Sequence, residues 1–313
     1  MPKRKVVFMF SGQGSHYFRM GQDLFEHDPI FREWMLRLDE LARSLSGERV
    51  VDAIYSVPER ETFDRTLQTH PAIFMVEYAL AQSLLHAGIT PDITLGASLG
   101  SFAAATVAGH TRVEDALAAV IQQAAAFEAC CDRGGMIAVL GDQTLYAEPF
   151  LRERSELAAV NFSSHIVVSA PQSNLAQIEA SLSEHDVVYQ RLPVSYAFHS
   201  QWIDDAQAPF ESFMSSIPRT SGTLPLACCR QATLSTELSN DFFWRVVREP
   251  IRFKETIAAL EQLGAYRYID VGPAGTLATF TKYCLPADSQ STAHAIMSPF
   301  GNERRSMAAL LRG

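Results

Sequence analysis

Apolar residues in the first 130 positions fall into short continuous runs and stretches with helical spacing. The run at 5–10 is rich in β-branched and aromatic residues, which is typical of a buried strand. Between 29 and 45 the apolar residues recur every three or four positions, which predicts an amphipathic helix. Similar patterns predict a strand at 93–95 and helices at 20–26, 70–87, 102–108 and 113–130. Strands that alternate with helices predict an α/β fold around a parallel sheet.

The pattern changes between residues 134 and 193. Short apolar runs at 136–140, 157–161, 165–170 and 187–192 predict four strands, and 144–154 and 174–184 predict two helices. The resulting order, βαββαβ, is that of a ferredoxin-like unit. We therefore predict a large α/β subdomain from residues 1–133 and 194–313, with a small ferredoxin-like subdomain inserted at 134–193. The large part is completed by predicted helices at 241–247 and 253–263 and a strand at 267–271.

Composition excludes several classes of protein. The formal net charge of −9 argues against non-specific nucleic-acid binding. No stretch is long and apolar enough to predict a membrane span. The five cysteines include two adjacent pairs and no Cys-x-x-Cys spacing, so we expect reduced thiols in a cytoplasmic protein and no zinc site.

The first candidate for chemistry is Ser98, in the sequence Gly96-Ala97-Ser98-Leu99-Gly100. A Gly-x-Ser-x-Gly motif between a strand and a helix fits a nucleophile elbow, which predicts an α/β-hydrolase-like large subdomain. The following helix begins near the serine, so its free N–H groups favour an oxyanion there. A turn that merely contains a serine is the alternative interpretation of the same motif.

A serine nucleophile needs a base, and His199 is the best candidate among the nine histidines. It follows Tyr196 and Phe198 at a break between a strand-like run and a polar helix start. A packing histidine is the competing interpretation. Asp142 and Asp186 lie between Ser98 and His199, so a Ser–Asp–His order is numerically possible.

Four motifs taken together resemble the malonyl-CoA:acyl-carrier-protein transacylases, which also serve as acyltransferase units of polyketide and fatty-acid synthases. In chain order they are Ser11-Gly12-Gln13-Gly14-Ser15, the Ser98 motif, Tyr196-Ala197-Phe198-His199-Ser200 and Asp270-Val271-Gly272-Pro273. The resemblance covers nearly the whole chain.

This resemblance implies a role for several residues. Ser98 would be the nucleophile and His199 the base, and the backbone N–H groups of Gln13 and Leu99 would form the oxyanion hole. A main-chain carbonyl would orient the histidine, and the matching position is Arg252. The family's active-site asparagine matches Asn161. No bound cofactor is implied, because the acyl group arrives on the phosphopantetheine of an acyl carrier protein or on coenzyme A.

The chain departs from the malonyl-specific pattern near the serine. The arginine that pairs with the malonyl carboxylate is replaced by Gln123, and a neutral amide does not offset the desolvation of a buried carboxylate. The usual histidine before the nucleophile is Ala97, and the usual glutamate after the motif is Ser101. Tyr196 and Phe198 combine the methylmalonyl and malonyl versions of the histidine motif. We expect neutral acyl groups to be accepted, as in the proofreading acyl hydrolases of trans-acyltransferase polyketide synthases.

We therefore expect the protein to be a monomer whose partner is the acyl carrier protein of a polyketide synthase. Arg245 and Arg248 lie one helical turn apart, with Arg252 and Lys254 behind them, and are candidates for a basic docking patch. An ordinary solvated face is the alternative. Two other functions stay open: an acyltransferase that passes the acyl group to a carrier protein, and a non-catalytic docking subunit of a synthase.

Overall fold

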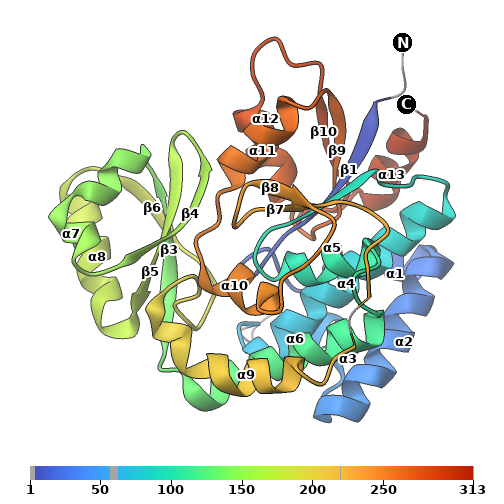
Figure 1. Cartoon of the computed structure of the whole chain (residues 1–313), viewed down its shortest axis with the longest axis horizontal. Helices are drawn as coiled ribbons and strands as arrows, with labels where there is room; N and C mark the ends of the chain where they lie inside the picture. The colour runs from blue at the N-terminus through green and yellow to red at the C-terminus, as the bar shows by residue number, and fades with distance from the viewer. Residues whose placement is uncertain (1–3, 57–62, 219, 313) are drawn as a thin grey trace.

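The computed structural model describes residues 4–56, 63–218 and 220–312 of the chain, and its strands form two separate sheets. Figure 1 shows the smaller sheet, drawn in green, to one side of the larger one. The larger sheet has the order β10-β9-β1-β2-β7-β8, and all its neighbours are parallel except the β7–β8 hairpin. Its strands are β1 (Lys5–Phe10), β2 (Ile93–Gly96), β7 (Leu226–Cys228), β8 (Thr233–Ser235), β9 (Tyr266–Asp270) and β10 (Thr292–Ala295).

The central strand β1 is buried on both faces, because helices cover both sides of the sheet. Phe8 and Phe10 point into the larger core, and Val7 and Met9 point into a second core on the opposite face. The larger core contains side chains from α1 (Gln22–His27), α2 (Pro29–Ser46), α3 (Val50–Tyr55), α4 (Thr66–His86), α5 (Gly100–Val107), α6 (Val113–Cys130) and α10 (Phe242–Arg248). The second core is covered by α11 (Phe253–Glu261) and α12 (Thr276–Cys284).

The smaller sheet has the order β4-β5-β3-β6, and all its pairs are antiparallel. Its strands are β3 (Gly134–Leu140), β4 (Glu156–Phe162), β5 (His165–Pro171) and β6 (Val188–Arg191), and α8 (Gln172–Glu184) packs against them. Counted within this unit, the strand order is 2-3-1-4, which is the ferredoxin-like arrangement. The predicted fold class, an α/β protein with an inserted ferredoxin-like unit, is confirmed.

Some elements differ from the sequence prediction. The helix expected at 144–154 is instead a 3₁₀ turn, η1 (Gln143–Ala147), followed by the short helix α7 (Pro149–Arg152). Pro149 forces Glu148 into an extended conformation and has no backbone N–H to donate, so the helix breaks there. Elements absent from the prediction are α3, η2 (Gln201–Ala206), α9 (Gln207–Met214), β7, β8, α12, β10 and α13 (Glu303–Arg312). Among the described residues, the helices are too short or too polar for one to traverse a lipid bilayer.

Candidate active site

Ser98 lies at a sharp turn between the end of β2 and the start of α5. Its φ of +55° is in the left-handed region, which a serine rarely adopts. The flanking glycines permit this turn: a Cβ on Gly96 would lie 2.4 Å from the Ser101 Cα, and one on Gly100 would lie 2.2 Å from the Phe10 carbonyl oxygen. The structure therefore has the strained elbow that the motif predicts.

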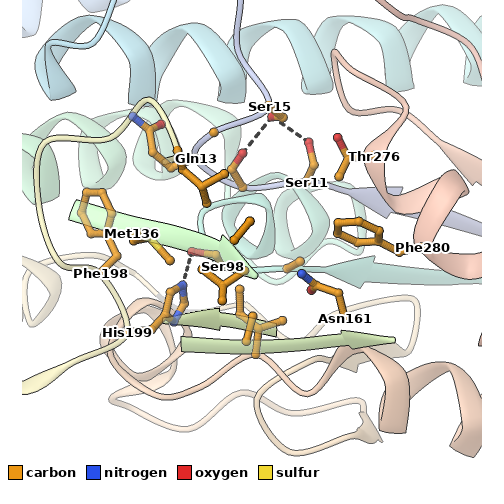
Figure 2. A pocket seen from close by; sticks show the side chains of 18 of the residues that line it. Ser11, Gln13, Ser15, Ser98, Met136, Asn161, Phe198, His199, Thr276 and Phe280 are labelled. Atoms are coloured by element: carbon orange, nitrogen blue, oxygen red, sulfur yellow. Dashed lines mark hydrogen bonds between the residues drawn. The ribbon is translucent and has the colours of Figure 1, made fainter. Parts of the chain in front are cut away.

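His199 lies directly beside Ser98. Its Nε2 is 2.8 Å from the Ser98 Oγ (Figure 2). Its Nδ1 is 2.7 Å from the carbonyl oxygen of Glu249. A carbonyl can only accept, so Nδ1 carries the proton and Nε2 is free to accept from the serine hydroxyl. This is the protonation state that a general base needs.

The prediction that the Arg252 carbonyl orients His199 is wrong. Arg252 precedes α11, and its carbonyl accepts hydrogen bonds from the backbone N–H and the Oγ1 of Thr256. The Glu249 carbonyl, at the end of α10, is the one that faces the histidine ring. The Arg252 carbonyl, three residues further along the chain, does not face His199 because it accepts the hydrogen bonds of the first turn of α11.

Burial controls the protonation of His199. The side chain is 2% exposed, and burial lowers its pKa from 6.5 to about 4, with a smaller lowering by the positive charge of Arg248. The hydrogen bond to Glu249 acts in the opposite direction. The ring is thus neutral at pH 7 and can accept a proton.

The loop after β1 packs against the elbow. A Cβ on Gly12 would lie 2.8 Å from the Ser98 Cβ and 2.9 Å from the Ala97 carbonyl oxygen, so only glycine fits. In the part of the chain that the structure describes, no protein group accepts a hydrogen bond from the backbone N–H of Gln13 or Leu99. Both groups remain available to a ligand, which is consistent with the predicted oxyanion hole.

Helix α4 holds this loop at two points. The Gln13 Nε2 donates to the Thr69 Oγ1 at 2.6 Å. The Ser11 N–H and Oγ donate to the Glu77 Oε1 at 2.6 and 2.9 Å. Glu77 is fully buried, and burial raises its pKa well above the ordinary value against the opposing effect of the Ser11 hydrogen bonds, which favours the neutral carboxyl.

A cavity of about 430 Å³ opens beside Ser98 and His199, where β1, β2 and β9 end. Its wall combines the elbow, the loop after β1, the small sheet and α12 (Figure 2). None of its described lining residues is Lys, Arg, Asp or Glu. Its polar groups come from Asn161, whose Nδ2 donates to the His165 Nδ1 at 3.1 Å, and from serine, threonine, glutamine and histidine side chains.

The structure places three of the predicted substrate contacts in this wall: Ala97, Asn161 and Phe198. Gln123 is fully buried outside the lining, and its Nε2 approaches the Phe243 carbonyl at 3.4 Å. Tyr196 also lies outside the lining, under the guanidinium of Arg133. These two predicted contacts are wrong, because both side chains pack into the core behind the cavity.

The predicted basic patch is also wrong. Arg245 pairs with Asp241 at 2.8 Å and with Glu249 at 3.4 Å. Arg248 pairs with Asp204 and lies 3.8 Å from Glu156. Acidic side chains thus neutralise both candidates. The sequence could not show the partners of Arg248, because Asp204 and Glu156 come from distant segments, whereas Asp241 and Glu249 lie one helical turn from Arg245.

Sequence reasoning missed other parts of the site. His165, Thr276 and Phe280 line the cavity, and Glu249 holds the histidine. Thr276 and Phe280 follow the predicted strand at 267–271, and the carboxyl end of a parallel strand was an available signal for them. Among the described residues no group of His, Cys, Asp and Glu is arranged to hold a metal ion.

A strained serine at a strand–helix turn, hydrogen-bonded to a neutral histidine, is the arrangement of serine-dependent acyl-transfer enzymes. A model of the acyl transferase domain matches residues 7–299, so this chain belongs to the acyl transferase family. It is 45% identical over 302 residues to the polyketide biosynthesis acyltransferase homolog BaeD of Bacillus velezensis, covering 96% of this chain and 93% of that protein. It is 40% identical over 305 residues to the homolog PksD of Bacillus subtilis, covering 96% and 94%. The crystal structure of MCAT from Streptococcus pneumoniae superposes with a TM-score of 0.82 at 26% identity, covering 98% of this chain and 99% of that one.

Proposed function

We propose that the protein cleaves neutral acyl groups from the phosphopantetheine thioester of acyl carrier proteins through an ester on Ser98. The Ser98 Oγ attacks the thioester carbonyl while its proton passes to the His199 Nε2. The C–S bond then breaks, and the imidazolium returns the proton to the departing thiolate. The Nδ1–H···O=C bond to Glu249 keeps the histidine in the orientation that this cycle needs.

The negative charge on the carbonyl oxygen needs donors in both tetrahedral intermediates. The N–H groups of Gln13 and Leu99 are the proposed donors, and each is expected to contribute about 3 kcal/mol to the barrier reduction. Glycine at position 12 supports this assignment, because it lets the loop approach the elbow.

The neutral cavity wall is the observation that carries the substrate assignment. A malonyl carboxylate placed there would lose its hydration without gaining a cationic partner from the lining, at a cost of several kcal/mol. Burial also lowers the pKa of His165, so this ring is neutral and supplies no positive charge. Acetyl and longer unsubstituted acyl groups face no such cost.

We further propose that water resolves the acyl-enzyme, with His199 taking a proton from the attacking water and returning it to Ser98. Removal of stalled acyl groups during polyketide biosynthesis is the role that this chemistry fits, and the printed names of BaeD and PksD support the pathway. The five free cysteines support a reducing, cytoplasmic location.

Transfer to a second carrier protein is the alternative, because it uses the same side chains and differs only in the acceptor. The relatives' description as acyltransferase homologs favours it.

The test is an intact-mass assay of carrier proteins loaded with acetyl, hexanoyl or malonyl groups. We expect rapid loss of the two neutral groups and at least ~100-fold slower loss of malonyl, equivalent to about 2.7 kcal/mol. Ser98→Ala provides the control for non-enzymatic loss. Stable malonyl loading of Ser98, followed by passage to a carrier protein, would overturn both the substrate class and the hydrolysis.

A further inference from the structure

The short segment 247–251, which we name the histidine strap, holds His199 at two points. The Val247 carbonyl accepts the backbone N–H of His199 at 2.9 Å, and the Glu249 carbonyl accepts its Nδ1–H at 2.7 Å. Arg248 lies between these two carbonyls. A displacement of the strap therefore moves both the main chain and the ring of the histidine.

The guanidinium of Arg248 ties the strap to two other segments. It pairs with both carboxylate oxygens of Asp204, in the η2 turn that follows His199. Its Nη1 lies 3.8 Å from the Glu156 Oε2, on β4 of the small sheet. The Glu156 carboxylate also accepts the backbone N–H of Gln201, at 3.2 and 3.3 Å. Arg248 is therefore the point where α10, η2 and β4 meet.

The strap also extends the small sheet. The Ile251 N–H donates to the Ala158 carbonyl at 2.8 Å, and the Ile251 carbonyl accepts the Val160 N–H at 2.9 Å. The Ile251 side chain lines the cavity. Residues 247–251 thus contact the edge of the small sheet, one wall of the cavity and the base His199.

We propose that Arg248 is a positioning residue, which fixes the histidine strap through Asp204 and Glu156 and thereby sets the orientation of His199 toward Ser98. This rests on the proposed use of His199 as the base. The pairing is partly shielded, since the Arg248 side chain is 26% exposed. A planar guanidinium that engages both oxygens of Asp204 also fixes direction, which an ammonium group cannot reproduce.

Arg245 is a matched control on the same helix. It is also ion-paired, but with Asp241 and the Glu249 side chain, and within the described part of the chain these ion pairs do not reach η2 or β4. It is more exposed than Arg248, at 46%. Its removal costs two surface ion pairs, and it leaves in place the Arg248 contacts and the main-chain carbonyl of Glu249 that holds His199.

The experiment compares Arg248→Met, Arg248→Lys, Asp204→Asn and Arg245→Met in hydrolysis of acetyl-N-acetylcysteamine, a small thioester that needs no carrier docking. We expect Arg248→Met to lower kcat by ~10- to 100-fold with KM changed less than about twofold, because the base is misplaced by a fraction of an ångström. Arg248→Lys recovers part of this loss, and Arg245→Met stays within about twofold of the unsubstituted protein.

The pH profile separates positioning from a loss of folding. Arg248→Met removes a positive charge near His199, so the acid limb of kcat moves to higher pH. Asp204→Asn loosens the same strap but removes a negative charge, so kcat falls while the acid limb moves to lower pH. The other charged groups around the strap are Glu156, Arg230, Arg245, Glu249 and Arg252. Arg248→Met, Arg248→Lys and Asp204→Asn retain all five, and Arg245→Met removes only Arg245.

Equal kcat values and acid limbs for Arg248→Met and Arg245→Met would overturn the inference. A rise in KM confined to carrier-bound substrate would also overturn it, and would return Arg248 to a docking role. If Arg248→Met does not fold, Arg248→Lys and Asp204→Asn give the same decision. Absence of Ser98-dependent hydrolysis in the unsubstituted protein would instead refute the proposed function.

Discussion

The pH dependence of Ser98 reactivity follows directly from the burial of His199. The free imidazole titrates at 6.5, and burial lowers the pKa of this one to about 4. This pKa change corresponds to a free-energy cost of about 3.4 kcal/mol for protonating the buried ring. Only the neutral ring can accept the serine proton, so nucleophilicity should persist well below pH 6.

The assay is the rate at which a fluorophosphonate labels Ser98 between pH 3.5 and 8, with His199→Ala as the control for labelling without a base. We expect a constant rate above about pH 5.5 and half of it near pH 4. Half-maximal labelling near pH 6.5 would refute the reasoning, because it would mean that the histidine is hydrated in solution.

Acid unfolding has to be separated from this titration. Burial also lowers the pKa of His16 to about 4 and that of His70 to about 3. The unfolded chain binds protons at these histidines near pH 6.5 and the folded chain does not, so their contribution to stability is lost as the pH falls below 6.5. Rates are therefore divided by the native fraction, measured by circular dichroism at each pH.

Substitutions at three further positions test the site. Gly12→Ala should slow acylation of Ser98 by at least ~100-fold in a fluorophosphonate assay, because the new methyl group displaces one oxyanion donor; a change under about threefold would contradict the assigned hole. Glu77→Ala should lower the free energy of unfolding, measured in urea, by about 2 to 4 kcal/mol, because two Ser11 donors lose their acceptor. Glu77→Gln keeps an acceptor oxygen and should lower it by less than half as much. Equal losses would show that the carboxyl is not acting as a neutral acceptor. Gln123→Arg should leave the malonyl-to-acetyl ratio of Ser98 loading within about twofold, measured by intact mass on folded protein, because position 123 lies behind the cavity wall; a rise of ~10-fold or more would show that this position does reach the acyl group.

The sequence was sufficient for the parts of the protein that depend on local pattern. The elbow depends on two glycines within five residues, and the ferredoxin-like unit depends on the order of six short patterns. Both were predicted, because turn chemistry and hydrophobic periodicity act over short distances.

Contacts between distant segments were not predictable in the same way. The partner of His199 is Glu249 rather than Arg252, because the choice depends on where α11 starts its first turn. The partners of Arg245, Asp241 and Glu249, lie four residues away on either side and could be read from the sequence, but only the fold brings Asp204 and Glu156 to Arg248. Gln123 lies on the expected helix, but the packing of neighbouring aromatic side chains decides that it stays behind the cavity wall.

The central claim is that water receives the acyl group from Ser98. The most direct measurement is to incubate an acetyl-loaded carrier protein with the enzyme in H₂¹⁸O, with an excess of a second, unloaded carrier of different mass. The proposed function predicts acetate that carries one ¹⁸O atom and a second carrier that stays unloaded. With Ser98→Ala it predicts no labelled acetate above the non-enzymatic background. Acetyl transfer to the second carrier without ¹⁸O-labelled acetate would contradict it.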